Sequence, residues 1–185
     1  IVAWTPPCGQ CAQCVQFRQP HLCMTIQFTA AVTPNFTEDG EPIFGFVGTG
    51  TFAEQLVVTQ EAVVKIDDDV PFDVASLIGC GVTTGVGAAI NTAEVKPGST
   101  CVVFGCGGVG MSVIQGCRIA GAAVIVAVDL NEDKLEAAKR FGATHGVSPD
   151  GLAALSGEVT GGQGFDYAFE AIGLPATIRA AYDAA

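Results

Sequence analysis

The pattern of apolar and polar residues changes near position 83, and the part that follows alternates between short apolar runs and amphipathic stretches. The expected strands are residues 99–105, 122–129, 144–147 and 165–171. The expected helices are residues 109–120, 132–141, 152–159 and a segment that begins after Pro175. Because strands and helices alternate, this part of the chain predicts an α/β fold with a parallel sheet and right-handed crossover connections.

The helix expected at residues 132–141 has clear signals at both ends. The Asn131 side chain can accept a hydrogen bond from a free N–H group of the first turn. Glu132 and Asp133 lie at the positive end of the helix dipole, and Gly142 can close the helix. Because of these signals, the bounds of this helix are predicted more closely than the bounds of the other expected helices.

The part before position 83 has a different pattern. Residues 51–59 and 62–66 are rich in β-branched side chains and predict strands. Residues 29–45 mix Thr, Pro, Asn, Asp and Gly, and are expected to form a loop. We therefore expect two partial domains, residues 1–82 and residues 83–185.

Composition and charge exclude several classes of protein. The chain has 185 residues, of which 49% are hydrophobic and 15% charged, proportions that suit a globular core. Its net charge of −11 argues against a nucleic acid or an anionic membrane as partner. The most apolar stretch, residues 119–128, is too short to cross a bilayer. Because the chain begins without Met and ends within a pattern, we expect an internal fragment of a longer protein.

Four cysteines cluster near the start of the chain at a spacing typical of metal ligands. They are Cys8, Cys11, Cys14 and Cys23. Two residues lie between each successive pair of the first three, and eight residues lie between Cys14 and Cys23. Four thiolates complete a tetrahedral zinc shell with no position left for water or substrate, which predicts a structural zinc site. We place this zinc lobe at residues 5–27. Reduced thiolates also favour a cytoplasmic protein.

Other interpretations of the cysteine cluster are buried thiols, disulfides or a nucleic-acid-binding zinc ribbon. Regular spacing within a segment that contains several Gln and Pro residues disfavours buried thiols. A zinc ribbon that binds nucleic acid usually has basic neighbours, and only Arg18 is near.

A glycine-rich turn joins the first strand to the first helix of the α/β part. Residues 105–110 fit the pattern G-x-G-x-x-G. Gly105 permits a tight turn, Gly107 lets the backbone approach a pyrophosphate, and Gly110 lets the helix pack close to the sheet. Free N–H groups at the helix N-terminus attract phosphates. Four strands are expected, fewer than in a complete dinucleotide-binding sheet.

An acidic residue ends the next strand, as a dinucleotide site requires. Asp129 lies 19 positions after Gly110 and can accept hydrogen bonds from the ribose hydroxyls. Its charge would repel a 2′-phosphate, so NAD is favoured over NADP. Lys134 can reach the ribose or a phosphate, or can be a solvated helix lysine. The alternative to this site is a glycine-rich turn beside a solvent-facing Asp.

The remaining cysteines lie in apolar surroundings. Cys80 lies between two glycines, and composition alone favours a core position over metal ligation. Cys101 and Cys117 are expected in the core of the sheet domain. Cys106, within the glycine turn, can approach a cofactor.

Together these motifs resemble those of zinc-containing medium-chain alcohol dehydrogenases, related to the class I and class III types. The resemblance covers nearly all of the chain. It rests on the cysteine cluster, the glycine turn, and residues 48–52 (GTGTF), 64–67 (VKID), 77–81 (LIGCG) and 169–173 (FEAIG). One departure is the interval between Cys14 and Cys23, which is one residue longer than is common in the family.

The resemblance implies a partial Rossmann domain that binds NAD, preceded by the C-terminal part of a GroES-like catalytic domain. It implies that Cys80 is the third protein ligand of a catalytic zinc, whose other ligands, a Cys and a His, lie outside this chain. Phe46 and Val47 match positions that line the substrate pocket. The implied cofactor site consists of Thr84, Gly105, Gly107, Gly108, Val109, Gly110, Asp129, Leu130, Lys134 and Ile172.

The implied reaction is the reversible, NAD-dependent oxidation of an alcohol to an aldehyde or ketone by hydride transfer at zinc. Cys80 and Thr84 are the catalytic residues that this chain would supply, and the chain alone is expected to be inactive. Alternatives are an S-(hydroxymethyl)glutathione or formaldehyde dehydrogenase, a polyol dehydrogenase, or a non-catalytic homologue that binds NAD and zinc. The expected partners are a small alcohol or aldehyde and, for the full-length protein, identical subunits in a homodimer or homotetramer.

Overall fold

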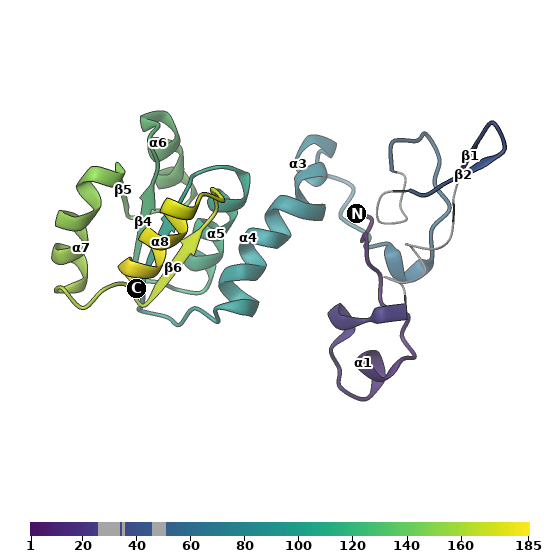
Figure 1. Cartoon of the computed structure of the whole chain (residues 1–185), viewed down its shortest axis with the longest axis horizontal. Coiled ribbons are helices and arrows are strands. Elements are labelled where there is room, and N and C mark those ends of the chain that lie inside the picture. The colour runs from purple at the N-terminus through teal and green to yellow at the C-terminus, as the bar shows by residue number, and fades with distance from the viewer. Residues whose placement is uncertain (26–33, 35, 46–50) are drawn as a thin grey trace. The chain divides into compact units, whose positions relative to one another are not determined.

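A computed structural model describes residues 1–25, 34, 36–45 and 51–185 (Figure 1). The chain forms two compact units, Ile1–Gly79 and Cys80–Ala185, which divide close to position 83. Each unit is described by itself, beginning with the second.

The unit Cys80–Ala185 is built on a parallel sheet of four strands in the order β5-β4-β3-β6. The strands are β3 (Thr100–Phe104), β4 (Val124–Val128), β5 (His145–Val147) and β6 (Tyr167–Glu170). In register, Thr100 lies opposite Val124 on one side of β3, and Cys101 lies opposite Tyr167 on the other. From β3 the chain adds β4 and β5 on one side, and then crosses back to add β6 on the other side of β3. The strand order therefore reverses between β3 and β6, as in a dinucleotide-binding sheet. The predicted α/β fold with a partial Rossmann sheet is confirmed.

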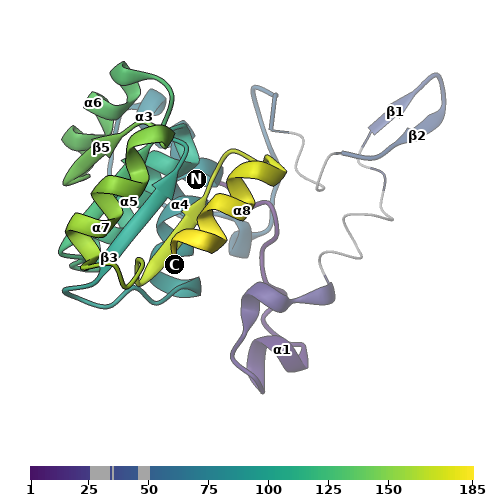
Figure 2. The same cartoon turned by 60° about the vertical axis from the view of Figure 1, so that its left-hand side comes forward.

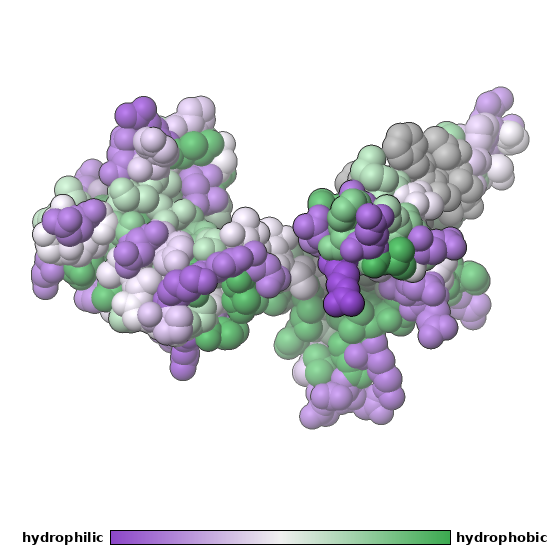
Figure 3. Space-filling view, turned by 90° about the horizontal axis from the view of Figure 1, so that it is seen from below, coloured by the Kyte–Doolittle hydropathy of each residue, from purple (hydrophilic) through white to green (hydrophobic). Residues whose placement is uncertain are grey.

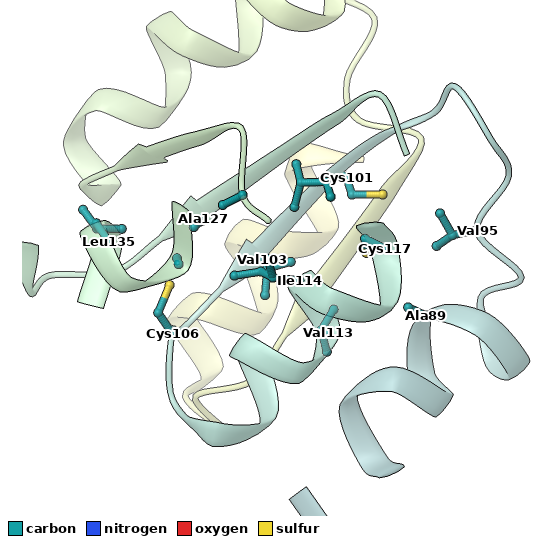
Figure 4. Close-up of a cluster of buried hydrophobic side chains, with 13 residues drawn as sticks. Ala89, Val95, Cys101, Val103, Cys106, Val113, Ile114, Cys117, Ala127 and Leu135 are labelled. Carbon is teal, nitrogen blue, oxygen red and sulfur yellow. The ribbon is translucent and has the colours of Figure 1, made fainter. Parts of the chain in front are cut away.

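Helices cover both faces of this sheet. They are α5 (Gly108–Ile119), α6 (Glu132–Phe141), α7 (Leu152–Thr160) and α8 (Pro175–Ala184). On one face, Val103 and Ile125 pack with Ile114 of α5 and Leu135 of α6 (Figure 4). On the other face, different residues of the same strands pack against α7 and α8, and Figure 2 shows α8 beside β6. Successive strand residues point to opposite faces, and both faces are covered, so β3 and β4 are apolar except for Thr100 at the start of β3.

The bounds of α6 are those expected from the sequence. The Asn131 side chain accepts a hydrogen bond from Lys134 N at 3.2 Å, which caps the first turn. Gly142 closes the helix with a φ of 124°, a conformation that side chains rarely adopt. A short 3₁₀ turn, Pro149–Gly151, leads into α7.

A helical run over residues Phe72–Thr92 was not predicted. It consists of α3 (Phe72–Leu77), a π-turn (Ile78–Val82), α4 (Thr83–Gly87) and a second π-turn (Ala88–Thr92). An 18-residue window of this 21-residue run has a mean hydropathy of 1.4, so by length and composition the run could cross a membrane, and 17% of that window is buried.

Within the second unit, this run packs closely against α5 through small residues. A Cβ atom on Gly85 would lie 2.5 Å from Ser112 Cβ and 2.7 Å from Val113 N. A Cβ atom on Gly116 would lie 2.8 Å from Ala89 Cβ. The small residues are four positions apart on each helix, so they form one stripe along which the two backbones approach. On this face the run is covered by α5, which itself packs on the sheet.

The described part of the unit Ile1–Gly79 contains short elements. They are α1 (Ala12–Val15), a 3₁₀ turn (Pro20–Leu22), the hairpin of β1 (Phe36–Glu38) and β2 (Glu41–Ile43), a second 3₁₀ turn (Gln60–Ala62), and α3. The hairpin turns at Asp39 and Gly40, whose φ angles of 48° and 85° suit a tight connection. The loop expected over residues 29–45 therefore contains two short strands.

The strands predicted at residues 51–59 and 62–66 are wrong. A bend, irregular chain and the 3₁₀ segment occupy these residues, and Val63 forms an isolated bridge to Val2. Phe52 and Val57 are fully exposed, so within the described residues no neighbouring strand packs against their side chains. A tendency to form strands depends on such partners. The GroES-like character of residues 1–82 stays a prediction.

Candidate functional site

The sulfur atoms of the four clustered cysteines lie within 4.8 Å of one another. Cys11 Sγ is 3.5 Å from Cys14 Sγ and 3.9 Å from Cys23 Sγ, and Cys8 Sγ is 4.0 Å from Cys14 Sγ. Zinc–sulfur bonds of about 2.3 Å in a tetrahedron separate the sulfurs by about 3.8 Å. The four sulfurs therefore already surround a space of the right size for one zinc ion.

Local backbone geometry brings these cysteines together. Gly9, at a φ of 72°, turns the chain between Cys8 and Cys11. Cys11 N donates to Cys8 Sγ at 3.4 Å, and Cys8 N donates to Cys23 Sγ at 3.3 Å. N–H groups directed at sulfur stabilise thiolates, the form that binds metal.

The pKa values of the cysteine cluster reflect this arrangement. The backbone N–H groups of Gln10 and Cys11 lower the pKa of Cys8 to about 6. Desolvation, and then the hydrogen bond with Cys11, raise the pKa of Cys14 to about 11. The lowered pKa of Cys8 favours its thiolate, and because metals bind thiolates, binding of a metal would release the proton of Cys14.

The predicted dinucleotide residues gather at the carboxyl ends of β3, β4 and β6. Gly105 follows β3 with a φ of 92°, and Gly107 is the N-cap of α5, with no side chain capping this helix. A Cβ atom on Gly105 would lie 2.6 Å from Ile172 Cγ1, and one on Gly110 would collide with the Gly105 carbonyl oxygen. The fold itself therefore requires glycine at positions 105 and 110.

Contacts within the described part of the chain do not explain why positions 107 and 108 are glycine. Among the described residues, nothing lies within 4 Å of a Cβ atom built on either one, and neither has a positive φ. Open space beside two glycines, at the uncapped start of a helix, suits the close approach of a phosphate group. The geometry therefore fits a pyrophosphate.

Asp129 lies next to this open space at the end of β4. Its Oδ2 accepts a hydrogen bond from Cys106 N at 2.8 Å, and its Oδ1 accepts one from Asn131 N at 3.0 Å. Partial burial by itself would raise the pKa of Asp129. The N–H groups of Cys106 and Asn131, with the Lys134 ammonium 4.0 Å away, outweigh this effect and lower the pKa below its ordinary value. The carboxylate is therefore charged at neutral pH and fixes the glycine turn.

Three predicted contact residues present apolar surface at the same edge. Val109 begins the first turn of α5, Leu130 follows Asp129 and is 87% exposed, and Ile172 follows β6 and is 47% exposed. Cys106, in contrast, is buried, and burial followed by the nearby Asp129 charge raises the pKa of its thiol to about 11. Its side chain belongs to the core, while its N–H group fixes Asp129.

Cys80 and Thr84 are exposed on the helical run that precedes β3. The Thr83 hydroxyl donates to the Cys80 carbonyl oxygen at 3.1 Å, within the π-turn. π-Turns are frequent at functional positions. Among the described residues, the groups of three or more metal-ligating side chains do not include Cys80, so its role as a zinc ligand stays a prediction. Phe46 and Val47 lie outside the described residues.

Two features of this edge were not predicted from the sequence. One is the close packing of Gly85 against α5, which places Thr84 beside the first turn of that helix. The other is Glu170, which accepts hydrogen bonds from the loop after β6. The sequence does contain a signal for Glu170, namely an acidic residue at the end of an expected strand with Gly173 three residues later.

Known proteins resemble this chain in sequence and in structure. A family model described as zinc-binding dehydrogenase matches residues 108–185. The structure of an alcohol dehydrogenase zinc-binding domain protein from Burkholderia ambifaria is 34% identical with a TM-score of 0.82, over 100% of this chain and 52% of that one. Benzyl alcohol dehydrogenase from Acinetobacter calcoaceticus is 32% identical with a TM-score of 0.82, over 100% and 51%.

A third similar structure matches less of the chain. The 2R,3R-butanediol dehydrogenase from Bacillus subtilis is 32% identical with a TM-score of 0.59, over 69% of this chain and 36% of that one. The chain thus spans about half the length of the first two structures, and about a third of the length of the third.

Proposed function

Because the chain belongs to the zinc-binding dehydrogenase family, we propose that it supplies the NAD-binding part of a zinc-dependent alcohol dehydrogenase. The whole protein would oxidise an alcohol reversibly to an aldehyde or ketone, with NAD as the hydride acceptor. The observation that carries this proposal is the pair of glycines at positions 107 and 108. They face open space at the uncapped start of α5, beside the charged Asp129.

In this proposal, residues of the second unit bind and orient the cofactor. N–H groups of the first turn of α5 donate to the pyrophosphate, and Asp129 accepts from the ribose hydroxyls. Lys134, close to Asp129, can approach the same ribose or a phosphate. Val109, Leu130 and Ile172 supply apolar contacts. Thr84 lies one residue before the contact of Gly85 with α5 and would flank the nicotinamide.

The two proposed zinc ions have different roles. The four-cysteine cluster would hold a structural zinc, because four thiolates leave no ligand position open. Cys80 would supply one thiolate to a separate catalytic zinc. When bound, the catalytic zinc polarises the substrate oxygen and NAD accepts the hydride. Exposure of Cys80 leaves its sulfur accessible to further ligands.

We propose a cytoplasmic enzyme. The packing of the helical run against α5 supports this location over a membrane.

The test is cofactor binding by the 185-residue chain, measured by isothermal titration calorimetry with NAD⁺ and NADP⁺. We expect NAD⁺ to bind more tightly, and Asp129→Asn to reduce this preference by about tenfold, since it removes the charge that repels a 2′-phosphate. Glu94→Gln is the matched control, because it removes an exposed charge before the amino end of β3. Equal affinities for the two cofactors, or no binding, would contradict the proposal.

A further inference from the structure

The Glu170 carboxylate, at the end of β6, accepts three hydrogen bonds at one oxygen. Oε1 accepts from Ile172 N at 3.0 Å, from Gly173 N at 2.8 Å and from the Thr177 hydroxyl at 2.7 Å. Gly173 has a φ of 86°, which lets the loop turn back toward the carboxylate. The loop after β6 and the first turn of α8 are therefore fixed to one side chain.

Hydrogen-bond donors and the start of a helix, rather than a cation, stabilise the charge of Glu170. The four ion pairs among the described residues do not include it. The first turn of α8 carries no acidic residue, and its N-cap Leu174 offers no capping side chain; Glu170 is joined to this turn through the Thr177 hydroxyl. Partial burial would raise the pKa of Glu170, but the Thr177 hydroxyl and the N–H groups of Gly173 and Ile172 lower it overall. The carboxylate therefore remains ionised at neutral pH.

The fixed loop forms one wall of the space at the glycine turn. Ala171 N donates to the Phe104 carbonyl oxygen at 2.9 Å, which joins the loop to the end of β3. Ile172 Cγ1 lies 2.6 Å from the position of a Cβ atom on Gly105, so its side chain covers that glycine. Ile172 is nevertheless 47% exposed, and its remaining surface faces solvent at the edge where the dinucleotide residues gather.

We propose that Glu170 is a positioning residue for the cofactor: it holds the loop 171–173 so that Ile172 forms a fixed apolar wall beside the glycine turn. The inference rests on the proposed binding of NAD and adds a residue that would not touch the cofactor. Without the carboxylate, the two N–H groups of the loop lose their common acceptor, and Ile172 becomes free to leave Gly105. A ligand must then order the loop when it binds, which lowers affinity.

The opposite end of β6 offers a matched control. Asp166 Oδ2 accepts hydrogen bonds from Thr100 N at 2.8 Å and from the Thr100 hydroxyl at 2.9 Å. Like Glu170, it is a carboxylate held by backbone and hydroxyl donors, but it has one backbone donor instead of two and lies at the amino end of the strand. Its removal should destabilise the sheet without altering the cofactor edge.

The experiment compares Glu170→Ala, Asp166→Ala and Glu170→Gln in the 185-residue chain, with NAD⁺ affinity and melting temperature measured for each. We expect Glu170→Ala to weaken NAD⁺ binding by about tenfold. Asp166→Ala should change it by less than about twofold although it lowers the melting temperature. Glu170→Gln should restore most of the affinity, because its amide oxygen can still accept from the loop.

Two results would overturn the inference alone: unchanged affinity in Glu170→Ala, or the same loss of affinity in both alanine variants. Failure of the unsubstituted chain to bind NAD⁺ would instead overturn the proposed function, and the inference with it. If Glu170→Ala does not fold, Thr177→Val removes one donor from the same carboxylate and should weaken NAD⁺ binding by about threefold. Unchanged affinity in that folded variant would equally refute the inference.

An NMR measurement without ligand examines the loop itself. Amide protons that donate to a carboxylate resonate at low field. The Ile172 and Gly173 amide signals should therefore move upfield in Glu170→Ala and remain in place in Asp166→Ala. Amide signals that do not move in Glu170→Ala would show that the carboxylate does not hold the loop.

Discussion

In the unit Cys80–Ala185, the strands β3 and β4 are buried on both faces. The described part of Ile1–Gly79, by contrast, buries only three of its hydrophobic residues, Cys23, Ala62 and Ala75. Figure 3 shows apolar side chains at the surface of this unit, and Trp4 and Phe17 are among the exposed ones. A segment that buries so little cannot obtain its stability from the hydrophobic effect. Apolar packing therefore stabilises the sheet unit, whereas metal coordination is the stabilising interaction that we propose for the cysteine lobe.

The largest expected effect is the loss of zinc from the lobe. Cys11→Ser removes one of four thiolates, and structural zinc binding contributes on the order of 10 kcal/mol, so we expect the lobe to lose its metal and its ordered structure. The sheet unit should melt at an unchanged temperature. Zinc content by elemental mass spectrometry and melting by circular dichroism measure the two outcomes.

The control for this experiment is Cys117→Ala, which removes a fully buried thiol from the sheet unit. It should lower the melting temperature and leave the zinc content unchanged. The comparison between the two units would fail if Cys11→Ser kept a full equivalent of zinc, or if it destabilised the sheet as much as the control does.

A smaller effect is expected where the helical run packs on α5. Gly85→Ala forces a Cβ atom against Ser112 and Val113, and overpacking of this kind costs about 1–3 kcal/mol. Gly157→Ala lies within α7 with open space around it, so higher helix propensity should stabilise it by about 0.5–1 kcal/mol. Urea denaturation of both variants measures the difference. Stabilisation by both substitutions would show that the close packing contributes nothing.

The smallest effect is the response of the sheet unit to acid. The pKa of Asp129 is lower in the folded chain than its ordinary value of 3.8, so its ionised form favours folding. This contribution is complete above pH 3.8 and is lost as the pH falls through the lower, folded-state value. Asp129→Asn should therefore flatten the decrease in the free energy of unfolding between about pH 4 and pH 2. An unchanged slope would contradict this expectation.

The second unit was predictable because its local signals agree with one another. Apolar strands, the Asn131 cap and Gly142 each specify the same element bounds that the packed sheet requires. The first unit was less predictable. The β-branched residues at positions 51–59 favour strands, but a strand also needs a partner, and that depends on contacts far away in the sequence.

Candidate site residues divide in a similar way. The cysteine and glycine motifs could be found because their spacing is regular. The structure brings the four cysteine sulfurs together and begins α5 directly after Gly107, and the ligands of both motifs stay predictions. The helix at residues 72–92 was missed because its glycines and threonines are poor helix formers, and packing against α5 overrides this preference. Glu170 was missed because its hydrogen bonds exist only once the loop has turned back.

The sequence separation of the contacts that close each unit also affects the order in which the two units fold. The contact between Cys8 N and Cys23 Sγ spans 15 residues, whereas Thr100 must meet Asp166 across 66. Short loops close quickly and at little entropic cost, while distant strand pairs form slowly. On a ribosome, the cysteines could therefore capture their metal soon after they emerge. The pairing of β3 with the edge strand β6 must wait until β6 has been synthesised, so the incomplete sheet would be exposed to aggregation during that interval.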